Sequence, residues 1–298
     1  MKNIVKKVKD LYIRFMNKIS RQYLYSKMNR YILSDGRRTS MSDDDVYPAF
    51  CYVVSKDNHY FRNFRRNDIY NRVLEHVTQQ LGQEYLDVIG RNKELQFADT
   101  DWNGFRQNDL YGNPRVFPYE INGHVADFSP TTLRYVKVLQ DIVTLFETSQ
   151  INSVAEIGIG YGGECRVLTS YLTAIGQYFL FDIPEALGLA KKYLDKFDNK
   201  ADIRFVNGID LDVDETCEYD LVISNYAFSE LNREVQDMYL KKVILKSGAG
   251  YITWNSLSRD FMDGYSMDEL LKIIPGSSVI AEEPLTAVNN CIIIWGSK

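Results

Sequence analysis

The spacing of apolar residues changes along this chain and predicts helices first, then strands that alternate with helices. Between residues 4 and 23 apolar side chains recur every three or four positions, with Lys and Arg between them. That spacing predicts one amphipathic helix over about residues 1–33. From 47 to 110 the pattern is irregular but helical, and Asn67 is the expected cap of a helix with apolar positions at Ile69, Val73, Leu74 and Val77.

Residues 99–130 are rich in Asp, Asn, Gly and Pro and interrupt this helical pattern. Turn chemistry on that scale predicts a long ordered loop, of the kind that covers a substrate. Ser129 and Pro130 then begin a helix, as cap and first-turn proline. We therefore expect a helical N-terminal region over 1–128 and a second domain over 129–298.

In the second domain, short apolar runs alternate with helical segments. Alternating strands and helices imply right-handed crossovers and a parallel sheet. The last two strands have only a short polar link, which requires a hairpin and makes one of them antiparallel. The predicted fold class is α/β, a doubly wound seven-stranded mostly parallel sheet with a helical N-terminal extension. The expected strands are 154–157, 178–183, 203–206, 219–224, 250–254, 278–281 and 291–295.

The composition is that of an ordinary globular protein, with 298 residues, 45% of them hydrophobic and 25% charged. No apolar run is long enough to cross a bilayer, and the N-terminus lacks a signal-peptide pattern. The cysteines and histidines are scattered, which predicts no metal site, and the thiols are those of a reduced, cytoplasmic protein. They lie at Cys51, Cys165, Cys217, Cys291, His59, His76 and His124.

The formal net charge of −5 hides an asymmetry between the two ends of the chain. Residues 1–38 hold eleven Lys and Arg against two Asp, so the rest of the chain is strongly acidic. An acidic body argues against a nucleic-acid partner. The basic helix either lies peripherally on the inner membrane surface, or packs on the protein or a second copy.

A glycine-rich turn follows the first strand of the sheet and precedes a helix. Gly158, Gly160 and Gly163 fit a dinucleotide-binding pattern, with Asp182 about 20 residues further on. However, Glu156 at the tip of the strand would repel a pyrophosphate. A carboxylate there suits S-adenosyl-L-methionine, which carries an ammonium and a cationic sulfonium.

The sequence Glu-Ile-Gly-Ile-Gly-Tyr-Gly-Gly over 156–163 resembles the first motif of the class I S-adenosylmethionine-dependent methyltransferases. Residues 224–231, 251–255 and 129–135 further resemble a bacterial family of sugar O-methyltransferases. That resemblance covers about residues 113–255. It implies transfer of a methyl group to a sugar hydroxyl in the synthesis of capsule or O-antigen polysaccharide.

Ligands of doubly wound sheets bind beyond the carboxyl ends of the strands, which selects candidate cofactor residues. Glu156 and the backbone of Gly158, Gly160 and Gly162 should hold the methionine and ribose. Asp182 is expected to accept from the ribose hydroxyls, or else to cap the next helix. The resemblance places Asp210 near adenine, although it equally suits a turn. The further candidates are Ile183, Asn225, Tyr226, Arg134 and Tyr135, the last two of which could bind the cofactor carboxylate or simply cover the sheet.

A sugar hydroxyl is a weak nucleophile, so a general base should assist the transfer. Glu230, after the fourth strand, is one candidate and His124, in an Asn-Gly-His turn, is the other. Both also have structural interpretations, as a carboxylate at a helix start and as a loop histidine. No cluster of ligands predicts a metal, so we expect a metal-free reaction.

Three other functions remain open at this point. The chain could methylate another small acceptor, such as a phenol, an amine or a phosphorylated metabolite. It could be an oxidoreductase with a nicotinamide cofactor, or a non-catalytic adaptor that docks through its basic helix. A binding experiment with S-adenosylhomocysteine and NAD would distinguish a methyltransferase from an oxidoreductase.

Overall fold

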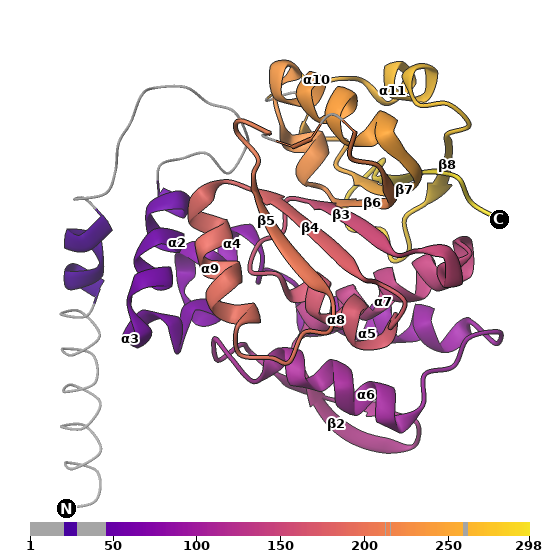
Figure 1. Cartoon of the computed structure of the whole chain (residues 1–298). Coiled ribbons are helices and arrows are strands. Elements are labelled where there is room, and N and C mark those ends of the chain that lie inside the picture. The colour runs from indigo at the N-terminus through magenta and orange to yellow at the C-terminus, as the bar shows by residue number, and fades with distance from the viewer. Residues whose placement is uncertain (1–20, 29–45, 212, 215, 259–261) are drawn as a thin grey trace, which may run out of the picture.

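The computed structural model describes residues 21–28 and 46–298, except for 212, 215 and 259–261 (Figure 1). Its centre is a seven-stranded sheet in the order β5-β4-β3-β6-β7-β9-β8. Strand β9 pairs antiparallel with both of its neighbours, and the other pairs are parallel. The predicted fold class is therefore confirmed. The strands are β3 (Ser153–Ile157), β4 (Gln177–Asp182), β5 (Asp202–Asn207), β6 (Tyr219–Asn225), β7 (Ser247–Trp254), β8 (Ser278–Ala281) and β9 (Cys291–Trp295).

Helices cover both faces of this sheet (Figure 1). Successive residues of β3 point to opposite faces, so Val154 belongs to one hydrophobic core and Ala155 to the other. Helices α7 (Pro130–Leu145), α8 (Gly163–Tyr171) and α9 (Pro184–Leu194) line the first core. Helices α10 (Arg233–Lys242) and α11 (Met267–Ile273) line the second. As expected, Ser129 caps α7 by accepting from the Thr132 N–H at 3.2 Å.

The N-terminal helices pack on the first face, with α2 against α9 and α5 against α7. Their apolar residues join the same core as those of β3 and α7, so the core extends across the predicted boundary at residue 128. Within residues 21–28, Leu24 and Met28 are buried and Lys27 pairs with Asp57 at 2.6 Å. The rest of the predicted basic helix lies outside the described residues. The helices are α2 (Val46–Lys56), α3 (Asn58–Phe61), α4 (Asp68–Val73), α5 (Gln79–Arg91) and α6 (Asp99–Arg106).

The segment predicted as a substrate-covering loop is regular structure instead. It contains α6 and a hairpin of β1 (Phe117–Ile121) and β2 (His124–Phe128). Asn122 and Gly123 have φ of 51° and 78°, which is the geometry that Asn-Gly favours in a two-residue hairpin turn. The prediction of a long loop is therefore wrong, and whether this segment covers a substrate stays a prediction.

The helix that begins after Asn67 is shorter than predicted, because its apolar positions were expected to continue to Val77. The Asn67 side chain does cap α4, accepting from the Ile69 N–H at 3.0 Å. However, α4 ends at Val73 and α5 begins only at Gln79. Between them the Glu75 carboxylate pairs at 2.5 Å with Arg65, which is fully buried. This ion pair places the intervening loop against the interior.

Candidate functional site

The glycine turn between β3 and α8 has the backbone conformation that its composition predicts. Gly158, Gly160 and Gly162 have φ of 79°, 56° and 81°, a region that side chains with a Cβ rarely adopt. A Cβ on Gly160 would also collide with the Leu74 side chain. The N–H of Gly158 donates to the Phe181 carbonyl at 2.9 Å, which ties the turn to β4.

Asp182 ends β4 and holds this turn in place. Its carboxylate accepts from the Ile159 N–H at 2.9 Å and from the Ile183 N–H at 2.8 Å. Burial raises the pKa of Asp182 to about 6, against the opposing effect of these N–H groups. The cap of α9 is Ile183, so the alternative interpretation of Asp182 as a helix cap is wrong. Each carboxylate oxygen can accept more than one hydrogen bond, which leaves capacity for a ligand.

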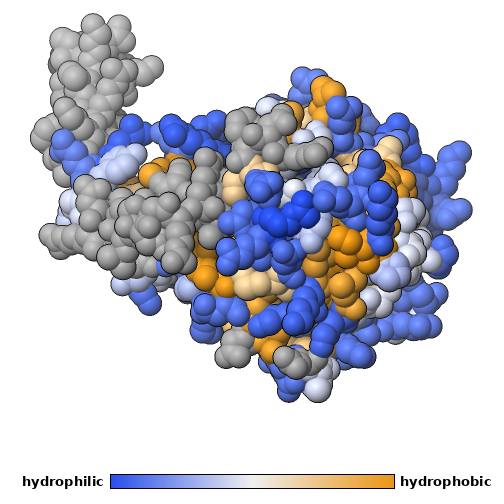
Figure 2. Space-filling model, turned by 90° about the horizontal axis from the view of Figure 1, so that it is seen from above, coloured by the Kyte–Doolittle hydropathy of each residue, from blue (hydrophilic) through white to orange (hydrophobic). Residues whose placement is uncertain are grey.

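A cavity of about 400 Å³ lies beside the turn, at the carboxyl ends of β3, β4 and β6. The face seen from above in Figure 2 shows apolar side chains among mainly hydrophilic ones. Loops after the strands form one wall, and α2, the α4–α5 loop and α5 form another. Eight of the candidate residues line it: Gly158, Gly160, Asp182, Ile183, Arg134, Asn225, Tyr226 and Glu230.

Glu156 lies behind the turn and does not line the cavity. Its side chain is buried and accepts from the Tyr178 hydroxyl at 2.8 Å. Burial, and next the nearby Glu164 carboxyl, raise the pKa of Glu156. Direct contact of Glu156 with a cofactor therefore stays a prediction, and the geometry gives this residue a buried position in the first strand.

The buried polar atoms without a hydrogen-bond partner among the described residues include Arg134 Nε and Glu164 Oε1. Arg134 lines the cavity, and Glu164 is bonded through its other oxygen to the Asn225 amide. Burial raises the pKa of Glu164 to about 8, although the positive charge of Arg134 opposes this. Buried polar atoms are normally satisfied, so unpartnered ones beside a cavity indicate a ligand site. The sequence singled out Arg134 but not Glu164.

The remaining cofactor candidates do not line the cavity. Gly162 is the residue before α8, and Tyr135 is buried next to Tyr161. Asp210 is exposed and accepts from the Asn207 amide at 2.7 Å, which is the turn role considered above. The neighbouring residues Gly208 and Ile209 do line the cavity.

The two candidate bases have different positions. Glu230 lines the cavity and accepts from the Asn255 amide at 2.9 Å, and burial raises its pKa. His124 is exposed on β2, where it faces Ile121 in the hairpin. The structure does not bring His124 to the cavity, because the Asn-Gly turn places it on a strand of a separate small sheet.

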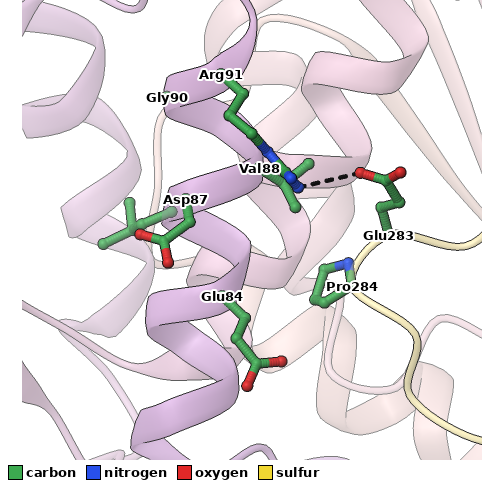
Figure 3. Close-up of a pocket in the computed structure, with 8 residues that line it drawn as sticks. Glu84, Asp87, Val88, Gly90, Arg91, Glu283 and Pro284 are labelled. Carbon is green, nitrogen blue, oxygen red and sulfur yellow. Dashed lines mark hydrogen bonds and ion pairs between the residues drawn. The ribbon is translucent and has the colours of Figure 1, made fainter.

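The link between β8 and β9 reaches the same cavity from the C-terminal side. Thr286 lines the cavity and bonds the Tyr226 hydroxyl at 3.0 Å. Tyr226 has φ of 66°, which is a strained conformation at the end of β6. Arg91 of α5 pairs with Glu283 of this link at 3.1 Å, across an open depression (Figure 3). Both side chains are mostly exposed, so this pair contributes little stability.

Sequence reasoning did not find the N-terminal wall of the cavity. Leu74, His76, Val77 and Tyr85 line it, and none belongs to a motif with fixed spacing. The apolar spacing placed Leu74 and Val77 on a helix but did not indicate that they face the cavity, and His76 between two helices carries no periodic signal. In the described ranges, no group of three or more His, Cys, Asp or Glu side chains is placed to hold a metal ion. No helix among the described residues is long and apolar enough to span a membrane.

Together the sheet order, the antiparallel last strand and the cavity at the glycine turn define a Rossmann-like fold of the methyltransferase type. No protein-family model and no curated protein matches the sequence.

Several solved structures are similar over about half of the chain. PigF with SAH aligns over 54% of this chain and 54% of its own, at 17% identity and a TM-score of 0.41. The N-methyltransferase NodS from Bradyrhizobium japonicum WM9, in complex with S-adenosyl-L-homocysteine (SAH), aligns over 54% and 83%, at 11% identity and 0.42. The mitomycin 7-O-methyltransferase MmcR aligns over 56% and 55%, at 12% identity and 0.40. Likenesses at this level do not define the activity of this chain.

Proposed function

We propose that this chain is a class I methyltransferase that uses S-adenosyl-L-methionine to methylate a sugar hydroxyl in the synthesis of bacterial surface polysaccharide. The assignment of this cofactor rests on one observation, which is that three groups line the same cavity. These are the glycine turn, the carboxylate of Asp182 and the unpartnered guanidinium atom of Arg134. When bound, the cofactor supplies an electrophilic methyl group on a sulfonium.

The side chains of the cavity fit the parts of that cofactor. Arg134 carries a buried positive charge and a free donor, which suits a carboxylate. Asp182 retains acceptor capacity for the two ribose hydroxyls. Gly208 and Ile209 offer close backbone approach and an apolar surface for a flat base. Asp182 and Glu230 contribute carboxylates to the walls, which favour a cationic centre over a pyrophosphate.

The proposed sugar acceptor fits the polar groups on the outer walls. Asn225, Asn255, Thr286 and Asn290 line the cavity and present amide and hydroxyl groups beside Glu230. Amide and hydroxyl groups on a cavity wall offer hydrogen-bond partners to a substrate rich in hydroxyls. This supports a sugar over a phenol, which is the competing acceptor class.

The cofactor is tested by thermal unfolding of the full chain with SAH or NAD. A ligand that binds only the folded state raises the melting temperature, by an amount that grows with its concentration over Kd. We expect SAH to stabilise the protein and NAD to leave it unchanged. Stabilisation by NAD alone would support the oxidoreductase and contradict the methyltransferase.

The acceptor is tested in the native host. Deletion of the gene should remove one methyl group from the surface polysaccharide, as read by mass spectrometry of the isolated glycan. Complementation with the wild-type gene is the control. An unchanged glycan would contradict the sugar acceptor and leave methyl transfer to another small molecule.

We also propose a cytoplasmic enzyme whose basic N-terminal helix contacts the inner membrane or a second copy. Removal of residues 1–20 should abolish association with anionic liposomes in the first case and change the oligomer size in the second. This deletion retains Leu24 and Met28, which are buried in the protein.

A further inference from the structure

The loop between α4 and α5 places a histidine at the cavity wall. The proposed function gives this histidine no role. His76 lines the cavity and is exposed in it. Its ring makes no hydrogen bond within the part of the chain that the structure describes. An imidazole without a partner, at the wall of the candidate active site, is available to a substrate.

The residues on either side of His76 fix its direction. Glu75 is anchored inside by the ion pair with Arg65 and accepts from the Thr131 hydroxyl at 3.1 Å. Val77 is buried, and Thr78 caps α5 by accepting from the Leu81 N–H at 3.1 Å. With its neighbours held against the interior, the His76 side chain points to the cavity.

We propose that His76 accepts the proton of the acceptor hydroxyl, from this fixed loop on the N-terminal wall of the cavity. The inference rests on the proposed methyl transfer. The hydroxyl proton passes to the unprotonated ring nitrogen, and the hydroxyl oxygen forms the new bond to the methyl carbon. The electron pair of the broken carbon–sulfur bond stays on sulfur, and the ring later releases its proton to water.

The surroundings of His76 favour its unprotonated form. Partial desolvation of the ring among the cavity residues, and next the charge of Arg134, lower the pKa of His76. A base works best when it is largely unprotonated at the operating pH but still basic enough to take the proton. Asp182 and Glu230 are the carboxyls that share the cavity. Its phenols, Tyr47, Tyr85, Tyr226 and Tyr239, are kept neutral because burial raises their pKa.

Glu230 then has a different task from His76. Its carboxylate already accepts from Asn255, which fixes its orientation on the opposite wall. A fixed carboxylate is suited to hold a second hydroxyl of the sugar. Replacement of Glu230 by Gln should therefore raise KM more than it lowers kcat, whereas a change at His76 should act on kcat.

The experiment compares full-length wild type, His76→Gln and the control His59→Gln, which alters an exposed histidine on α3. Calorimetry measures the affinity for SAH, and labelled S-adenosylmethionine measures transfer to a panel of nucleotide sugars and free hexoses. His76→Gln should keep the SAH affinity and lose about 10²–10⁴-fold in kcat. The acid limb of the wild-type pH profile should disappear in the His76 variant and persist in the His59 variant.

NMR titration gives a readout that needs no acceptor, because the chain has only three histidines. The His76 signal, assigned by its loss in the variant, should titrate below the ordinary value of about 6.5 and shift when SAH is added. A higher midpoint, a weakened SAH affinity in His76→Gln, or a retained kcat would overturn the inference. If no sugar of the panel accepts a methyl group, the NMR result decides. Failure of the wild type to bind SAH would instead overturn the proposed function itself.

Discussion

At the scale of single residues, Arg134 shows how burial creates a binding site. Its guanidinium lies at the cavity wall, with 8% of the residue exposed and its Nε atom without a partner. Within the described residues no ion pair is found for Arg134. A buried charge without a paired carboxylate is costly, and an anionic ligand group would compensate it.

Arg134→Gln should therefore weaken SAH binding more than it weakens the fold. Loss of a hydrogen bond to a charged group costs on the order of 1.5–3 kcal/mol, which is about 10- to 150-fold in Kd. Calorimetric titration with SAH measures this. Arg204→Gln is the control, because Arg204 is exposed on β5, where it pairs with Asp202. Equal SAH affinities of the two variants would show that Arg134 does not contact the ligand.

At the scale of elements, one buried ion-pair network joins the N-terminal helices to the glycine turn. Arg65 pairs with Glu75 at 2.5 Å and with Asp109 at 2.9 Å, and it donates to the Ser129 hydroxyl at 2.9 Å. The guanidinium carbon also lies 4.6 Å from the ring centre of Tyr161, which is buried inside the turn. The network thus fixes the start of α7, the α4–α5 loop and the turn relative to one another.

Arg65→Met should destabilise the protein by about 3–5 kcal/mol, because two buried carboxylates would lose their compensating charge. Urea denaturation measures the free energy of unfolding. Lys191→Met is the matched control, since the exposed pair of Lys191 on α9 with Asp195, the residue after this helix, should contribute only about 0–1 kcal/mol. Similar losses in both variants would mean that the network does not stabilise the fold.

At the scale of the whole molecule, several buried acids make stability depend on pH. Burial raises the pKa of Glu164 to about 8 and that of Asp182 to about 6, and it also raises the pKa of Glu156. The folded state therefore binds these protons more tightly than the unfolded state does. Their stabilising contribution is complete below about pH 4 and is lost as the pH rises through 6 and 8.

The free energy of unfolding of the cofactor-free protein should fall between pH 5 and about 8 for this reason. Glu164→Gln should flatten the upper part of that dependence, because Gln does not ionise. A series of urea denaturations at different pH values measures both curves. Glu147→Gln, at an exposed position after α7, is the control. Parallel curves for wild type and Glu164→Gln would contradict the role given to Glu164.

Much of the fold was predictable because its signals are local. Short apolar runs located the strands of the sheet to within a few residues, and Ser129 and Asn67 cap helices as expected. The β1–β2 hairpin was missed because its sequence is compatible with two structures. Asn122-Gly123 favours a hairpin, yet the polar residues around it also suit a loop.

The sequence by itself determined the sheet, its antiparallel last strand, the glycine turn and the position of Asp182 at the end of β4. Each follows from neighbours within a few positions and from the rule that strand ends meet at one edge. Only the tertiary structure decided that Arg65 is buried, that Glu156 lies behind the turn, and that His76 rather than His124 reaches the cavity. Those outcomes depend on contacts between residues far apart in the chain, and no local pattern encodes which side chain such contacts bury and which they expose.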